Sequence, residues 1–112
     1  MMTRYTAAGV LADMRDGKSV IYFGSRAAGT ELLADCVAMA GADEVARVAR
    51  ANGKERVDHR TGGSVRMVAS PHGLRGALPD VLVLEVQKDA DPRVWHEIQT
   101  VLAGGRTEIV RV

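Results

Sequence analysis

Aromatic residues are scarce in this sequence: one Trp, two Tyr and one Phe make up 4% of its 112 residues. The core must therefore be built from aliphatic side chains, and few rings are present on which unpaired bases could stack. The single cysteine, Cys36, excludes an internal disulfide framework and favours a reducing compartment. No apolar run approaches the roughly 20 residues of a membrane-spanning helix. These absences predict a cytoplasmic protein with an aliphatic core.

The length of the chain predicts one domain that spans residues 1–112. Apolar residues make up 46% of the chain, which is enough for one hydrophobic core, and 12.0 kDa is too small for two. Helical spacing of apolar residues predicts helices at 6–16, at 26–40 and from Pro92 to the stop at Gly104-Gly105. Apolar or alternating runs predict strands at 19–23, 55–60, 64–69, 81–86 and 107–112. Residues 45–50 are ambiguous, because Val45 and Val48 are three apart, as in a helix.

The alternation of helices and strands predicts an α/β fold: a small three-layer domain with a mostly parallel sheet. Strands 20–23 and 81–85 are expected to be parallel and adjacent at its centre. Glycines at 62 and 63 supply a hairpin turn between runs 55–60 and 64–69, so this pair is expected to be an antiparallel β-hairpin insertion. The run 108–112 is expected to be an edge strand.

The net charge is only +1, but the charge is unevenly distributed. Residues 47–75 carry seven cations against Glu55 and Asp58, whereas each flank has more acids than cations. If these cations share one groove, they could track the phosphates of a nucleic acid. The alternative is a solvated sheet face on which ion pairs contribute little. The seven cations are Arg47, Arg50, Lys54, Arg56, Arg60, Arg66 and Arg75.

Four stretches between residues 18 and 87 resemble, in the same order, the ATPase domain of phage terminase large subunits. They are KSVIYFGSR (18–26), RVARANGKE (47–55), TGGSVRMVA (61–69), and GLRG (73–76) with PDVLVL (79–84). The resemblance implies a P-loop ATPase-like core. Only 17 residues precede Lys18, so it also implies a truncated core without the P-loop. Gly17-Lys18-Ser19 matches the end of a Walker A motif, but Ala12 replaces its first glycine and a helix precedes it instead of a strand.

The end of the run 81–86 departs from that family. In such ATPases the strand ends in two acids, of which the first holds Mg²⁺ and the second polarises the attacking water. Glu85 stands at the first position, but Val86 stands at the second. This degenerate Walker B pair predicts a chain that does not hydrolyse ATP, is not an enzyme and needs no cofactor or metal. The three histidines, His59, His72 and His96, have no metal-ligand spacing.

The expected function is therefore that of a small, non-catalytic phage-encoded protein in the bacterial host cytoplasm. It would act by protein–protein interaction, with a host or phage protein, or by self-association into a homo-oligomer through its edge strand. One alternative is non-specific DNA binding through the seven cations of residues 47–75. A second alternative is weak nucleotide binding that uses Glu85 and Mg²⁺.

Overall fold

The computed structural model describes residues 4–51, 55–85 and 91–112. Its elements are, in chain order, α1 (Arg4–Arg15), β1 (Ser19–Phe23), α2 (Arg26–Met39), β2 (Val45–Ala49), β3 (Arg56–His59), β4 (Ser64–Val68), the 3₁₀ helix η1 (Pro71–Leu74), β5 (Val81–Leu84), α3 (Pro92–Ala103) and β6 (Glu108–Arg111). Among the described residues, no helix has both the length and the apolar character to cross a bilayer.

The strands form one six-stranded mixed sheet in the order β2-β3-β4-β1-β5-β6. Strand β1 pairs in parallel with both β4 and β5, and β6 pairs in parallel with β5. The predicted parallel, adjacent strands 20–23 and 81–85 are thus confirmed, as is the edge position of the run 108–112. Strands β3 and β4 are antiparallel, as predicted from the glycine turn, and β2 extends this antiparallel part of the sheet.

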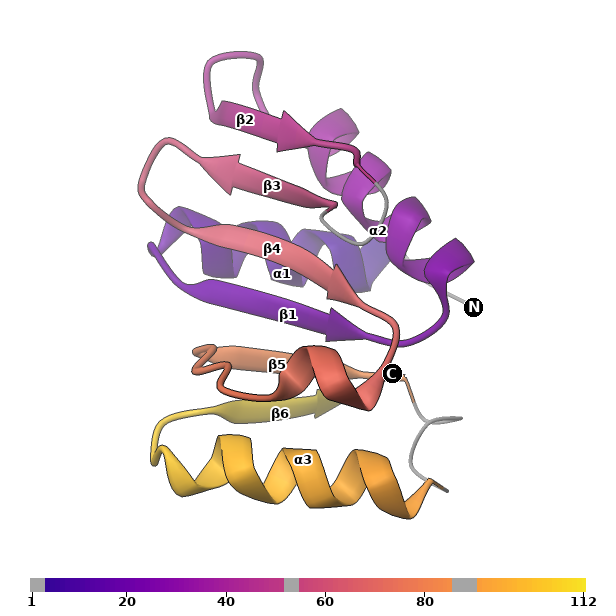
Figure 1. Ribbon diagram of the computed structural model, residues 1–112. Helices are drawn as coiled ribbons and strands as arrows, with labels where there is room; N and C mark the ends of the chain where they lie inside the picture. The colour runs from indigo at the N-terminus through magenta and orange to yellow at the C-terminus, as the bar shows by residue number, and fades with distance from the viewer. Residues whose placement is uncertain (1–3, 52–54, 86–90) are drawn as a thin grey trace.

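Helices cover the two faces of the sheet unequally. Helices α1 and α2 pack on one face, where Val20 and Tyr22 join their core, and α3 and η1 pack on the other, where Ile21 and Phe23 are buried (Figure 1). Because successive side chains of a strand point to opposite faces, β1 and β5 must be apolar throughout. This requirement explains the two continuous apolar runs of the sequence.

Helices α2 and α3 each begin with a side-chain cap. Ser25 accepts a hydrogen bond from the backbone N–H of Ala28 at the start of α2, and Asp91 accepts one from Arg93 at the start of α3. Pro92 follows at the first helical position, where its missing N–H costs nothing. The helix predicted at 26–40 is confirmed to within one residue.

Residues 45–49 form a strand, and their helical spacing has a specific cause. The register of β2 against β3 shifts between Val45 and Arg47. This irregularity lets Val45 and Val48, three residues apart, pair with His59 and Val57 on the same side of the sheet. A spacing that suits a helix is therefore produced by a β-bulge.

Strand β5 ends at Leu84, and Glu85 follows it. The Asn52-Gly53 turn and Val86 lie outside the described residues.

A polar cluster ties α1 to the antiparallel part of the sheet. Arg15 donates two hydrogen bonds to the carboxylate of Glu44, at 2.7 and 3.0 Å. The Nε2 atom of the buried His59 lies 3.0 Å from the same carboxylate. The hydroxyl of Thr61 donates to the carbonyl of Met14 at 2.5 Å. These contacts fix the β3–β4 turn against the end of α1.

The stability of the fold should decrease in acid because of Glu44. Hydrogen bonds from Arg15, from the N–H of Gly41 and from His59 hold the pKa of Glu44 well below its ordinary value of 4.5. A carboxyl group with a depressed pKa in the folded state stabilises the fold above its unfolded-state pKa, and this stabilisation is lost as the pH falls. We therefore expect the urea midpoint to decrease as the pH drops below 4.5.

The variant Glu44→Gln isolates this effect. It should have a lower urea midpoint than the wild type at neutral pH and a weaker dependence on acid, because it lacks the titrating group. The matched control Asp16→Asn changes an exposed acid next to Arg15 and should keep the dependence of the wild type. A Glu44→Gln protein with unchanged acid sensitivity would contradict this role of Glu44.

Candidate functional site

The neighbouring strands β1 and β5 are followed by helices that lie on opposite faces of the sheet. Strand β1 leads into α2 on one face, whereas β5 precedes α3 on the other (Figure 1). In α/β sheets, ligands commonly bind outside the carboxyl ends of strands where the connections diverge in this way. Gly24, Ser25 and Glu85 lie at this point, so this edge of the sheet is the first candidate site.

The carboxylate of Glu85 occupies the start of α2. Its Oε2 atom accepts a hydrogen bond of 2.6 Å from the backbone N–H of Ser25. A Cβ atom at Gly24 would lie 2.5 Å from the same oxygen and 2.9 Å from the ring of Tyr22, so only glycine fits there. Burial, and then the charges of Glu85 and Glu31, raise the pKa of Tyr22 to about 12. A helix N-terminus is a favourable anion site, and here the protein's own carboxylate fills it.

The second candidate surface is the side of β2, β3 and β4 that points away from α2, which we call the open face. Val57 and Val65 point into the core under α1 and α2, so their neighbours along the strands point the other way. Arg56 is directly opposite Arg66 in register, and Arg47 is opposite Asp58. Figure 1 shows that none of the described helices covers this side of β2 and β3. The open face is lined by Arg47, Ala49, Arg56, Asp58, Ser64 and Arg66.

The three arginines of the open face are only partly neutralised. Arg56 forms an ion pair with Asp58, with Nη2 and Oδ1 2.7 Å apart. No ion pair joins Arg66 to an acid among the described residues, and its pKa is lowered by burial and then by the charge of Arg56. Like charges directly opposite each other in a sheet are destabilising. The open face therefore has an excess of positive charge that a bound anion would relieve.

The open face is also hollowed. All three arginines, with Asp58 and Glu55, line a hollow of about 560 Å³. Arg56 and Arg66 also line a smaller hollow of about 230 Å³ that extends to Leu78, which is 74% exposed. A concave basic surface can accept a rod-shaped polyanion better than a flat one can, because more charges reach it at once.

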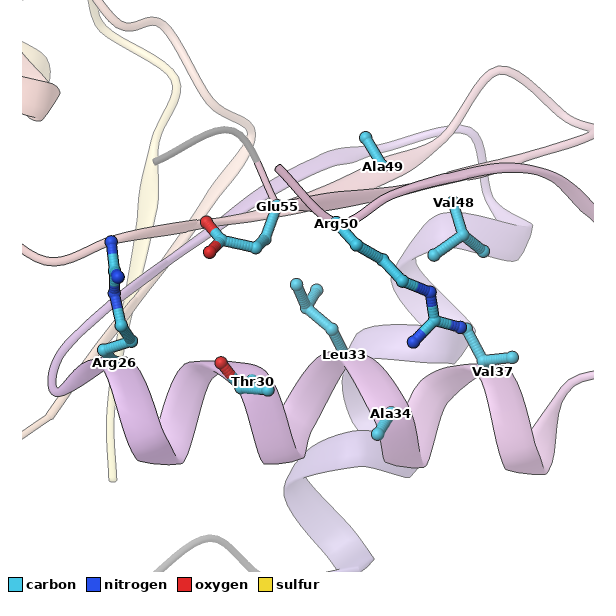
Figure 2. Close-up of a pocket in the computed structure, with 9 residues that line it drawn as sticks. All are labelled: Arg26, Thr30, Leu33, Ala34, Val37, Val48, Ala49, Arg50 and Glu55. Carbon is cyan, nitrogen blue, oxygen red and sulfur yellow. The ribbon is translucent and has the colours of Figure 1, made fainter. Parts of the chain in front are cut away.

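The other predicted cations do not belong to this surface. Arg60 forms an ion pair of 3.1 Å with Asp43, and Arg75 forms one of 3.3 Å with the buried Glu97. The side chain of Arg50 lies over α2 on the opposite side of the sheet (Figure 2). Lys54 lies outside the described residues. The structure thus brings together Arg47, Arg56 and Arg66, and separates them from Arg50, Arg60 and Arg75.

A pocket between α2 and β2 was not predicted from the sequence. Arg26 and Thr30 of α2 line it together with Arg50 and Glu55 (Figure 2). The signal was weak but present: Arg26, Thr30 and Val37 are spaced so that they share one stripe of a helix. No motif marks these residues, because the pocket combines segments that are distant in sequence.

The histidines and the cysteine form no metal site. Among the described residues, no group of three or more His, Cys, Asp or Glu side chains could hold a metal ion. His59 is buried and hydrogen-bonded, whereas His72 and His96 are exposed. Cys36 is fully buried, and burial, followed by the charge of Asp35, raises the pKa of its thiol to about 12. Such a thiol is a structural side chain and not a nucleophile.

Comparison with known proteins assigns no function to these surfaces. The chain matches no protein-family model, and no curated protein matches it. Their function must therefore be argued from their own geometry and charge.

Proposed function

We propose that this chain is a non-catalytic binding module whose open face binds the phosphate backbone of DNA. The observation that carries the proposal is the register of β2, β3 and β4. It places Arg47, Arg56 and Arg66 on one uncovered surface with a single acid, Asp58, on the same strands. Strands lie about 4.8 Å apart, so the arginines span roughly 10 Å across the sheet. That span covers several phosphates of one DNA strand, whose charges repeat about every 3.4 Å along the axis.

DNA binding of this kind should show little preference for sequence. Phosphate contacts position a protein on DNA but do not read the bases. The chain has few aromatic residues for stacking, with 4% in all. The open face therefore suits a duplex better than an unpaired strand.

Two features support the non-catalytic part of the proposal. The carboxylate of Glu85 already occupies the N-terminal amide of α2, where a phosphate would otherwise gain most from the helix. Val86 is aliphatic at the position where the ATPases that the chain resembles have the acid that activates water. The same contact of Glu85 disfavours the alternative of nucleotide binding with Mg²⁺. Phosphate release from ATP that depends on Glu85 would contradict this part.

The origin of the module is part of the same proposal. We infer a phage-encoded protein, acting in the bacterial cytoplasm, that derives from the ATPase core of a terminase large subunit with the β3–β4 hairpin as an insertion. The order of the four resembling stretches supports this origin. The parallel adjacency of β1 and β5, with Glu85 directly after β5, agrees with it.

The test is a binding titration with a 20-base-pair duplex, in which fluorescence anisotropy measures the affinity at two salt concentrations. Three phosphate contacts give a slope of about −2.7 in log affinity against log salt. The affinity should therefore fall roughly 40-fold between 50 and 200 mM salt. Duplexes of unrelated sequence should behave alike. The absence of a complex at micromolar protein and about 50 mM salt would exclude this function, because non-specific binders are tighter at that salt.

A second candidate function is self-association through β6. This strand lies at the edge of the sheet, and its Val110 is 38% exposed, with the adjoining Val112 37% exposed. Both valines line a trough of about 290 Å³ between α1 and the edge of the sheet. Unpaired edges with apolar side chains are commonly covered by another chain. Light scattering on the protein used for the DNA titration would then give twice the monomer mass of 12.0 kDa.

A further inference from the structure

A pocket of about 270 Å³ lies between α2 and β2, on the side of the sheet opposite to the open face (Figure 2). Its walls are largely aliphatic, with Leu33 and Val37 from α2 and Val48 from β2. Small-molecule sites combine such apolar walls with a few convergent polar groups. The volume lies near the lower end of the range for these sites, so the pocket suits only a small occupant.

One polar atom of this pocket lacks a partner. The Oε2 atom of Glu55 is buried, and none of the described residues donates a hydrogen bond to it. Buried polar atoms are nearly always hydrogen-bonded, and an unpaired carboxylate oxygen is among the most costly exceptions. Figure 2 shows the Glu55 side chain directed into the space above α2, between Arg26 and Arg50. The missing donor would therefore be supplied from the pocket.

The other polar groups of the pocket restrict the charge of a ligand that could supply this donor. Arg26 and Arg50 both line the pocket, so it holds two cations and one acid. A simple amine would satisfy Glu55 but would be repelled by Arg50. A simple acid would pair with an arginine but would leave the oxygen of Glu55 without a donor. Only a molecule that carries both charges complements the whole set.

We propose that this pocket binds a small aliphatic zwitterion of the size and charge of a free amino acid. Its ammonium group donates to Oε2 of Glu55, and its carboxylate accepts from the guanidinium of Arg50. Its aliphatic chain packs against Leu33, Val37 and Val48. This site uses none of the three arginines of the open face, although Ala49 and Glu55 border both hollows.

The test is a titration of the ¹⁵N-labelled full chain with three probes, in which binding is measured by the changes in amide chemical shifts. L-leucine carries both charges, L-leucinamide lacks the carboxylate, and 4-methylpentanoate lacks the amine. We expect L-leucine to shift the amides of residues 30–37 and 48–50, and each half-probe to bind at least tenfold more weakly. The absence of localised shifts up to about 20 mM L-leucine, well above the millimolar range of such small ligands, would overturn the proposal. Equal binding of 4-methylpentanoate and L-leucine would do so too.

Three variants assign the binding to this pocket. Glu55→Gln should weaken L-leucine binding at least tenfold, and Asp58→Asn, which removes an acid from the open face, should leave it unchanged. Ala34→Leu places a good helix-forming side chain at an exposed position of α2 that lines the pocket, and should abolish binding by filling it. This variant keeps Glu55, so it tests the site even if Glu55→Gln does not fold. Unchanged binding to Ala34→Leu would refute the assignment.

Discussion

Gly63→Ala is expected to destabilise the protein by about 3 kcal/mol, because the added methyl group has no space. Gly63 is buried where the β3–β4 turn meets the end of α1. A Cβ atom there would overlap the backbone carbonyl of Met14 and lie 2.7 Å from its Cα. Backbone atoms of a helix cannot move aside as the end of a flexible side chain can, so the turn and α1 would have to separate. The midpoint of thermal unfolding should fall by roughly 10–15 °C.

Gly9→Ala is the matched control, and it should have the opposite sign. Gly9 lies within α1, it is exposed, and nothing lies within 4 Å of a Cβ added to it. Alanine in a helix interior is favoured over glycine by roughly 0.5–1 kcal/mol, so the variant should be more stable than the wild type. Urea unfolding of both variants measures the difference. A Gly63→Ala protein as stable as Gly9→Ala would show that the turn does not press on α1.

The same glycine shows what the sequence could and could not predict. The pair Gly62-Gly63 indicated the hairpin, because the turn is a local property of the chain, and Gly62 does adopt a positive φ of 94°. The close approach of Gly63 to Met14 joins residues far apart in sequence, and no local pattern records it. Periodicity likewise identified β1 and β5, whose burial on both faces makes them apolar throughout. It failed at β2, where the bulge after Val45 imitates helical spacing.

The candidate site, too, was only partly predictable from the sequence. The sequence indicated Glu85 at the end of a strand, but its hydrogen bond to Ser25, 60 residues away, depends on the pairing of β1 with β5. Seven cations between residues 47 and 75 were evident from the sequence, but nothing in it showed which of them share a surface. A shift of one residue in register moves a side chain to the other face of a sheet. The bulge in β2 and the length of the β3–β4 turn therefore decide which arginines meet on the open face.

The double variant Arg56→Ala/Arg66→Ala should reduce the affinity for duplex DNA by one to two orders of magnitude at about 50 mM salt. It removes two of the three arginines of the open face, so the slope of log affinity against log salt should become shallower by about 1.8. The loss should be equal for all duplex sequences, because no base contact is removed. Anisotropy titrations of wild type and variant over the same salt range measure both quantities.

The control variant is Arg60→Ala/Arg75→Ala, which removes the same charge from the same basic segment but not from the open face. Both of these arginines are engaged with acids, Arg60 with Asp43 and Arg75 with Glu97. If the open face binds DNA, this control should keep nearly the affinity and the salt slope of the wild type. Equal losses in the two double variants would instead mean that the overall charge of the segment attracts DNA. Removing both arginines relieves the repulsion between Arg56 and Arg66, which oppose each other in register, but it also removes the ion pair of Arg56 with Asp58. The thermal unfolding midpoints of both double variants must therefore be compared with that of the wild type, so that a loss of binding is separated from a loss of fold.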